Sequence, residues 1–120
     1  MGLDITFNKI SCKQIGYFRK VNFLVSFFQE YGLDVVDQRP FSITKDMVEN
    51  LLNRCNKVLE NNNLAEDLLP TMNGFFFGPT EYDEWYFKDV KNVKLFIETS
   101  LLNQFDKLEP DEYIEFDIWY

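Results

Sequence analysis

The sequence predicts an α+β fold in which three to four helices pack on a small antiparallel sheet formed by the N- and C-terminal strands. Apolar and polar residues alternate at both ends of the chain, which is the period of a strand with one buried face. Between the ends, apolar residues recur at every third or fourth position, which is the period of an amphipathic helix. The chain has 120 residues, of which 46% are hydrophobic and 13 are Phe, so we expect residues 1–120 to form a single domain with one aromatic core.

The two predicted strands lie at the chain ends. Leu3, Ile5 and Phe7 alternate with polar residues, and the C-terminal segment has the same pattern. Its apolar face consists of Ile114, Phe116, Ile118 and Tyr120. Because an unpaired strand leaves its backbone donors and acceptors open, we expect the two strands to pair antiparallel with each other.

Helices are predicted between the strands. The first covers residues 17–31 and is the most buried, because apolar residues surround almost the whole segment. A second runs from an N-cap at Thr44 to about Asn61, after a connecting loop over residues 33–41. Asn63 is the predicted N-cap of a short helix that Pro70 ends.

The longest predicted helix follows Thr80, its expected N-cap. Its inward face consists of Tyr82, Tyr86, Val90, Val93, Ile97 and Leu101. The lysines Lys88, Lys91 and Lys94 share another face, which we interpret as solvated.

Charge is unevenly distributed along the chain. The net charge is −8, and residues 58–120 alone hold fourteen Asp or Glu against four Lys or Arg. This excess disfavours direct binding to nucleic acid or to an anionic membrane, and it suits a basic protein partner. The acidic residues near the C-terminus fit either a solvated turn and strand face or a surface that mimics a nucleic-acid backbone.

Several common functions find no support in the sequence. The chain has no His, which removes the usual general base and the commonest metal ligand, and its glycines form no phosphate-binding loop. We therefore expect no enzymatic activity and no cofactor. Cys12 and Cys55 are expected to be reduced thiols. The N-terminus does not resemble a signal peptide, and no apolar segment is long enough to span a membrane, so we expect a cytoplasmic protein.

The densest group of candidate functional residues lies in residues 68–89, Leu-Leu-Pro-Thr-Met-Asn-Gly-Phe-Phe-Phe-Gly-Pro-Thr-Glu-Tyr-Asp-Glu-Trp-Tyr-Phe-Lys-Asp. Aromatic side chains beside carboxylates, with basic residues from the first helix, suit a ligand or a peptide. The candidate binding residues are Arg19, Lys20, Phe75, Phe76, Phe77, Glu81, Tyr82, Asp83, Glu84 and Tyr86.

Two other interpretations of this segment stay open. The phenylalanines fit a buried segment between tight turns, and the residues after Thr80 fit an ordinary helix start. Glu81 and Glu84, with Asp83 nearby, fit an all-oxygen metal site, but acidic first turns also arise from the helix dipole alone. We predict no metal.

The sequence resembles a family of small uncharacterised phage and bacterial proteins. The shared features are the N-terminal Met-Gly-Leu-Asp, Arg19, Lys20 and Asn22, the Leu-Pro-Thr at residues 69–71, Gly-Phe-Phe-Phe-Gly at residues 74–78 and Thr-Glu-Tyr-Asp at residues 80–83. Ile5 and Thr6 replace the usual Met-Tyr. The resemblance implies a phage or mobile-element origin and no particular mechanism.

Together these features predict a protein-interaction module that acts through an acidic and aromatic surface. The alternative is a domain that binds a small ligand in the region of residues 74–89. The oligomeric state and the partner's identity are open.

Overall fold

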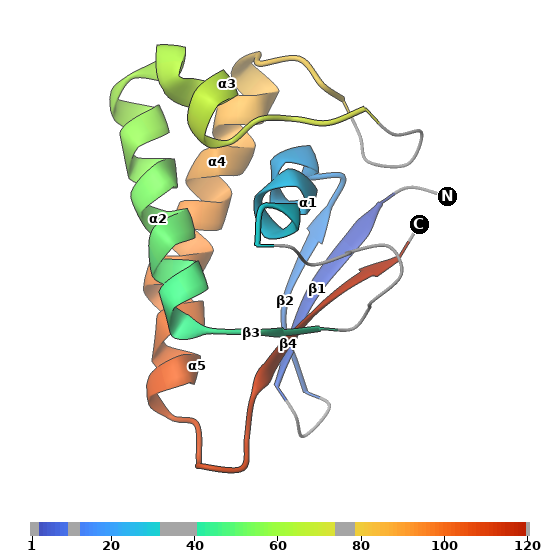
Figure 1. The fold of residues 1–120 in the computed structure, drawn as a ribbon, viewed down its shortest axis with the longest axis vertical. Coiled ribbons are helices and arrows are strands. Elements are labelled where there is room, and N and C mark those ends of the chain that lie inside the picture. The colour runs from blue at the N-terminus through green and yellow to red at the C-terminus, as the bar shows by residue number, and fades with distance from the viewer. Residues whose placement is uncertain (1–2, 10–12, 32–40, 74–78, 120) are drawn as a thin grey trace.

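The computed structural model describes residues 3–9, 13–31, 41–73 and 79–119. It confirms the α+β fold, with helices packed on a four-stranded antiparallel sheet (Figure 1). The strands are β1 (Asp4–Lys9), β2 (Lys13–Arg19), β3 (Phe41–Ile43) and β4 (Ile114–Trp119). Their order in the sheet is β2-β1-β4-β3.

The predicted pairing of the chain ends is confirmed. Strands β1 and β4 run antiparallel, with Ile5 opposite Ile118 and Phe7 opposite Phe116. Leu3, Ile5 and Phe7 are buried, so the alternation in the sequence marks the face of the sheet that meets the core.

The helices lie against that face. Helix α2 (Lys45–Glu60) runs beside α4 (Glu84–Phe96), and α4 continues through a π-helical segment, η2 (Ile97–Leu101), into α5 (Leu102–Asp106) (Figure 1). The short elements η1 (Asn62–Leu64) and α3 (Ala65–Leu68) follow α2. The inward residues predicted for the last helix are buried from Tyr86 to Leu101.

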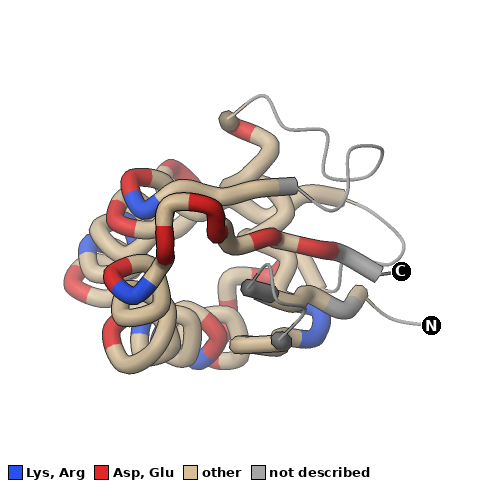
Figure 2. The backbone as a smooth tube through the Cα atoms, turned by 90° about the horizontal axis from the view of Figure 1, so that it is seen from below, with Lys and Arg blue, Asp and Glu red and all other residues tan. Residues whose placement is uncertain are grey.

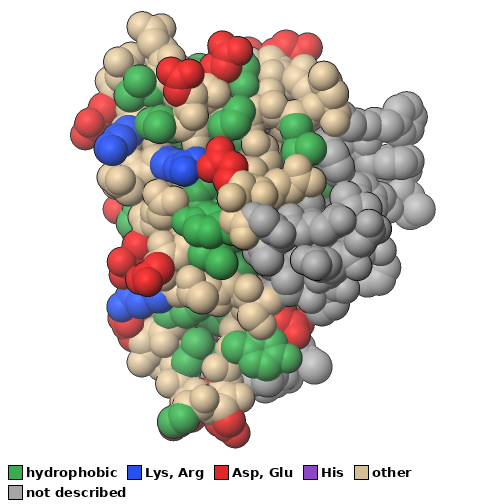
Figure 3. Space-filling model, viewed as in Figure 1, with side chains coloured by type: hydrophobic (Ala, Val, Ile, Leu, Met, Phe, Trp, Pro, Cys, Tyr) green, Lys and Arg blue, Asp and Glu red, His purple; other side chains and the backbone are tan. Residues whose placement is uncertain are grey.

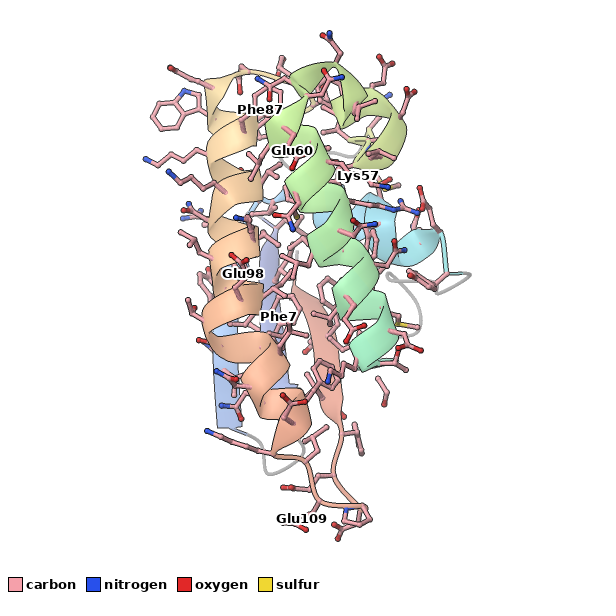
Figure 4. All side chains as sticks on the ribbon, turned by 90° about the vertical axis from the view of Figure 1, so that its left-hand side faces the viewer. Phe7, Lys57, Glu60, Phe87, Glu98 and Glu109 are labelled. Atoms are coloured by element: carbon pink, nitrogen blue, oxygen red, sulfur yellow. The ribbon has the colours of Figure 1, made fainter. Side chains whose placement is uncertain are left out.

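Helix α1 (Asn22–Gln29) is the most buried helix and joins the two layers. Its Phe28 ring lies 4.4 Å from the Phe116 ring of β4, measured between centroids. Its Phe23 ring lies 5.6 Å from the Tyr86 ring of α4. Phe7 of β1 completes this aromatic core, between the helices and the sheet (Figure 4) and 5.2 Å from Phe96.

The predicted first helix is wrong in its N-terminal part. Residues 13–19 form strand β2, and the helix begins only at Asn22. Lys20 lies between them with φ of 57°, a left-handed conformation that costs a non-glycine residue about 1–2 kcal/mol. The chain therefore reverses sharply where β2 passes into α1.

Two of the three predicted N-caps need correction. Thr44 does cap α2, since its hydroxyl accepts a hydrogen bond from the Met47 N–H at 3.2 Å. The cap after α2, however, is Asn61 and not Asn63. Helix α4 is capped by Asp83 and not by Thr80, so Glu81 and Asp83 precede the helix instead of lying in its first turn. Phe41, which was predicted to lie in a loop, begins strand β3.

Cys55 on α2 is a free, fully buried thiol, and burial raises its pKa to about 12. Cys12 lies outside the described residues. No helix in the described part of the chain has the length and apolar character needed to cross a membrane.

Candidate functional site

A pocket of about 110 Å³ lies where the start of α1 meets the N-terminal end of α4. Residues from three stretches of the chain form its walls, including the two segments that flank residues 74–78. The lining residues are Lys20, Asn22, Phe23, Thr71, Pro79, Glu81, Asp83, Trp85, Tyr86 and Asp89. We refer to this site as the α1–α4 pocket.

The floor of the pocket is built around Asn22. Its side chain is 4% exposed, yet it is fully polar. Its Nδ2 donates to the Met72 carbonyl oxygen at 2.9 Å, and its Oδ1 accepts from the Met72 N–H at 2.7 Å. The amide thus pairs with one backbone unit in the way that a neighbouring strand would, and it holds the segment after α3 against the start of α1.

Thr71 holds the same segment to the chain before α4. Its backbone N–H donates to the Tyr82 hydroxyl at 3.0 Å, and its own hydroxyl donates to the Thr80 carbonyl oxygen at 2.9 Å. The Tyr86 hydroxyl donates to the Leu69 carbonyl oxygen at 2.7 Å. These hydrogen bonds fix the two flanks of residues 74–78 relative to each other, and burial raises the pKa of Tyr86 above its ordinary value.

Asp83 positions the acidic wall. Its Oδ1 accepts hydrogen bonds from the N–H groups of Trp85 and Tyr86, both at 3.1 Å. A carboxylate at this position is favoured because the helix N-terminus carries unpaired N–H groups and a partial positive charge. Asp83 therefore starts α4 and at the same time places a carboxylate in the pocket.

Asp89 is the second acidic group on α4, and it is partly buried. Burial, followed by the nearby charge of Asp83, raises its pKa above the ordinary value of 3.8, while Lys88 acts in the opposite direction. Its surroundings therefore disfavour the anion, and a cation in the pocket would relieve that penalty.

The aromatic wall comes from Phe23, Trp85 and Tyr86. Tyr86 is buried and its ring packs against Phe23, whereas Trp85 is 64% exposed. The Lys88 ammonium lies 5.4 Å from the centroid of the Trp85 ring. This distance is within the range of a cation–π interaction, so the indole already has a cation near it.

The structure brings together four of the residues predicted for the site. Lys20, Glu81, Asp83 and Tyr86 line the α1–α4 pocket, whereas Arg19 and Glu84 are exposed and not among its described lining residues. Tyr82 has a structural role, because its hydroxyl accepts the Thr71 hydrogen bond and its ring contacts Tyr86. Phe75, Phe76 and Phe77 lie outside the described residues.

Sequence reasoning did not assign the other lining residues to the site. Asn22 and Thr71 belong to the segments from which a family resemblance was predicted, and those segments were the available signal. Trp85 and Asp89 are four residues apart on α4, a spacing that places both on one helix face. Pro79 and Phe23 carry no signal that separates them from ordinary turn and core residues.

The acidic residues do not form a metal centre in the part of the chain that the structure describes. There, no three His, Cys, Asp or Glu side chains are grouped so that they could hold a metal ion. Glu84 is the first residue of α4, and Asp83 uses one oxygen on the helix N-terminus. The geometry of the described residues therefore gives no support to the metal interpretation.

A second hollow of about 330 Å³ lies between the turn after α2 and the start of α4. Asn62, Asn63 and Glu66, which contribute to its lining, are all exposed. Its lining has one carboxylate, Glu66, and two aromatic rings, Tyr82 and Phe87, whereas the α1–α4 pocket has three carboxylates and an exposed indole. Comparisons of the chain with protein-family models, curated proteins and solved structures find no match.

Proposed function

We propose that this chain is a non-enzymatic cytoplasmic interaction module of phage or mobile-element origin, which binds a basic group of a partner protein in the α1–α4 pocket. The observation that carries the proposal is the pocket itself. It combines an exposed indole with carboxylates that make no ion pair among the described residues. Such a site favours a cation with an apolar stem.

The polar groups of the pocket fall into two classes. Asn22, Thr71 and Tyr86 are committed to backbone atoms of the protein, so they shape the walls. The side chains of Lys20, Glu81 and Asp89 make no hydrogen bond or ion pair among the described residues. A ligand would therefore meet one cation and three carboxylates, counting the second oxygen of Asp83. The balance is negative and favours a basic partner.

Charge elsewhere on the molecule supports a local site over a continuous acidic surface. Acidic residues lie in the segment before β4 and along that strand (Figure 2). On the face shown in Figure 3, however, acidic, basic and hydrophobic side chains are interspersed. A mimic of a nucleic-acid backbone needs a row of like charges, so this face favours recognition of one basic group.

Size separates this proposal from the small-ligand alternative. Pockets for drug-sized molecules typically measure about 300–1,000 Å³, whereas the α1–α4 pocket measures about 110 Å³. That volume suits the end of one side chain. A small amine of similar size is the second candidate, because the same carboxylates and indole would bind it.

The proposal is tested by affinity capture from a host lysate with a tagged protein at low and high salt. Two variants are compared with the wild type: Glu81→Gln/Asp89→Asn in the pocket, and Glu109→Gln/Asp111→Asn as the matched control. Both remove two negative charges, and Glu109 lies at the opposite end of the molecule from Phe87 of α4 (Figure 4). We expect a basic protein that the wild type and the control retain at low salt and that the pocket variant loses.

Two results would contradict the interaction module. Equal loss of the captured protein in both variants would show that overall charge, and not the pocket, drives binding. Absence of any captured protein, together with stabilisation of the wild type by a small amine in a thermal-shift screen, would favour the small-ligand function. The pocket variant would then lose that stabilisation.

A further inference from the structure

We infer that the group recognised by the α1–α4 pocket is the guanidinium of an arginine side chain presented by the partner protein. The inference rests on the proposed function and narrows it from a basic group to one chemical type. It follows from the spacing of the carboxylates, the exposed indole and the position of Lys20.

The carboxylates of the pocket are spread along its walls. Glu81 and Asp83 precede α4, and Asp89 lies in its second turn. Within the described residues, no three acidic side chains are grouped closely enough for a metal ion. An ammonium is likewise a compact charge that needs acceptors around one point, whereas a guanidinium carries five donors on a planar fork and reaches separated acceptors.

Part of the acidic wall is already in use. Asp83 directs Oδ1 to the first N–H groups of α4, which leaves its second oxygen for a ligand. Asp89 is partly buried and its anion is disfavoured there. Directed hydrogen bonds from two edges of one planar cation would satisfy both carboxylates, because the donors of a guanidinium point outward in different directions.

Trp85 supplies a surface on which a planar cation can stack, in competition with the Lys88 ammonium that lies 5.4 Å from the centroid of its ring. The indole is 64% exposed and lines the pocket, so one bound side chain would cover apolar area that is otherwise in contact with water. Guanidinium groups stack on aromatic rings and are more weakly hydrated than ammonium groups, so they lose less hydration free energy on binding there.

Lys20 opposes binding that depends on charge alone. Its side chain lines the same pocket and makes none of the ion pairs among the described residues. Its positive charge weakens the negative potential of Glu81, Asp83 and Asp89. The preference among cations must therefore come from hydrogen bonds and stacking, and both favour arginine over lysine.

Three blocked tripeptides test the inference on the full chain. Each has glycines around one central residue: arginine, lysine, or citrulline, which has nearly the same shape as arginine but no charge. Binding is followed by the NMR signal of the Trp85 indole N–H at constant ionic strength. We expect the arginine peptide to bind at least about tenfold more tightly than the lysine peptide, and the citrulline peptide not to bind.

Asp89→Asn and Asp111→Asn are the matched pair of variants, because each replaces one carboxylate by an amide. We expect Asp89→Asn to weaken arginine binding by about tenfold and Asp111→Asn to leave it unchanged. The backbone spectrum of each variant reports whether it is folded.

Each other outcome overturns part of the scheme. Equal or tighter binding of the lysine peptide refutes the arginine inference but leaves the interaction module standing. If no peptide binds while capture from lysate still depends on Glu81 and Asp89, arginine recognition is wrong and the module stands. If no peptide binds and capture is also independent of these residues, both proposals fail.

Discussion

Asn22 is the buried polar residue on which the geometry of the α1–α4 pocket depends. Its amide forms two hydrogen bonds with the backbone of Met72 at a site that is almost closed to water. Removing the side chain would leave the N–H and the carbonyl of the half-buried Met72 without these partners, and such groups are costly to leave unpaired. We expect Asn22→Ala to lower the free energy of unfolding by about 2–4 kcal/mol, as measured by urea denaturation.

Asn53→Ala is the control for this substitution, because Asn53 is an exposed residue of α2. It should change stability by less than about 0.5 kcal/mol. Equal effects of the two substitutions would show that the hydrogen bonds of Asn22 add nothing beyond those of a surface amide.

Gly16 is a second residue whose identity the structure explains. A Cβ atom at this position of β2 would lie 2.3 Å from the Phe96 Cζ atom, which is closer than atoms can approach. The Phe96 ring has little freedom to move, because it packs against Phe7 and Phe18. We expect Gly16→Ala to destabilise the protein by about 1–3 kcal/mol.

A double-mutant cycle isolates this contact. Phe96→Leu alone removes core contacts, but it also makes room for an alanine at position 16. The double variant should therefore be less destabilised than the sum of the two single variants, by about 1 kcal/mol in thermal or urea unfolding. Strict additivity would mean that the glycine is required for the backbone and not for the ring.

At the scale of elements, the start of α4 has two candidate N-caps, Thr80 and Asp83. Asp83 accepts two hydrogen bonds from the first turn, and Thr80 lies three residues earlier and takes part through its backbone carbonyl. We expect Asp83→Ala to cost about 1 kcal/mol of stability and Thr80→Ala to cost much less, as judged from thermal unfolding of both variants. The reverse ranking would restore Thr80 as the cap.

The elements that could be predicted from sequence are those with an uninterrupted period. Strands β1 and β4 show clean alternation, and the inward face of α4 repeats every three or four residues. Strand β2 was missed because Gly16 interrupts its alternation and because Tyr17 is in helical register with Val21, Leu24 and Phe28. The left-handed turn at Lys20, which separates β2 from α1, has no glycine to mark it.

The site was only partly predictable for a related reason. Residue types identified the acidic and aromatic side chains before and at the start of α4, and three of them, Glu81, Asp83 and Tyr86, line the pocket. Lys20 was also predicted, but Asn22, from the same end of the sequence, was not. Asn22 is 50 residues from its partner Met72, and no local pattern reports a hydrogen bond of that span.

At the scale of the whole molecule, the acidic residue whose charge we expect to affect the stability of the fold is one partly buried carboxylate, Asp89. The pKa of Asp89 is raised by burial and by the charge of Asp83. A carboxyl group whose pKa is higher in the folded protein than in the unfolded chain destabilises the folded state once it is ionised. The penalty is absent below the ordinary pKa of 3.8 and is complete above the raised value.

Asp89→Asn should therefore stabilise the protein at pH 7, and the gain should disappear as the pH falls toward 3.8. Because Asp89 is only partly buried and solvent screens its neighbours, we expect a gain below about 1 kcal/mol. Urea unfolding at a series of pH values measures it, with the exposed Asp111→Asn as the matched control. Loss of stability at pH 7 in Asp89→Asn would mean that the carboxylate already has a favourable partner in the folded protein. If the same substitution stabilises the chain and weakens arginine binding, the Asp89 carboxylate lowers the stability of the fold and contributes to ligand binding.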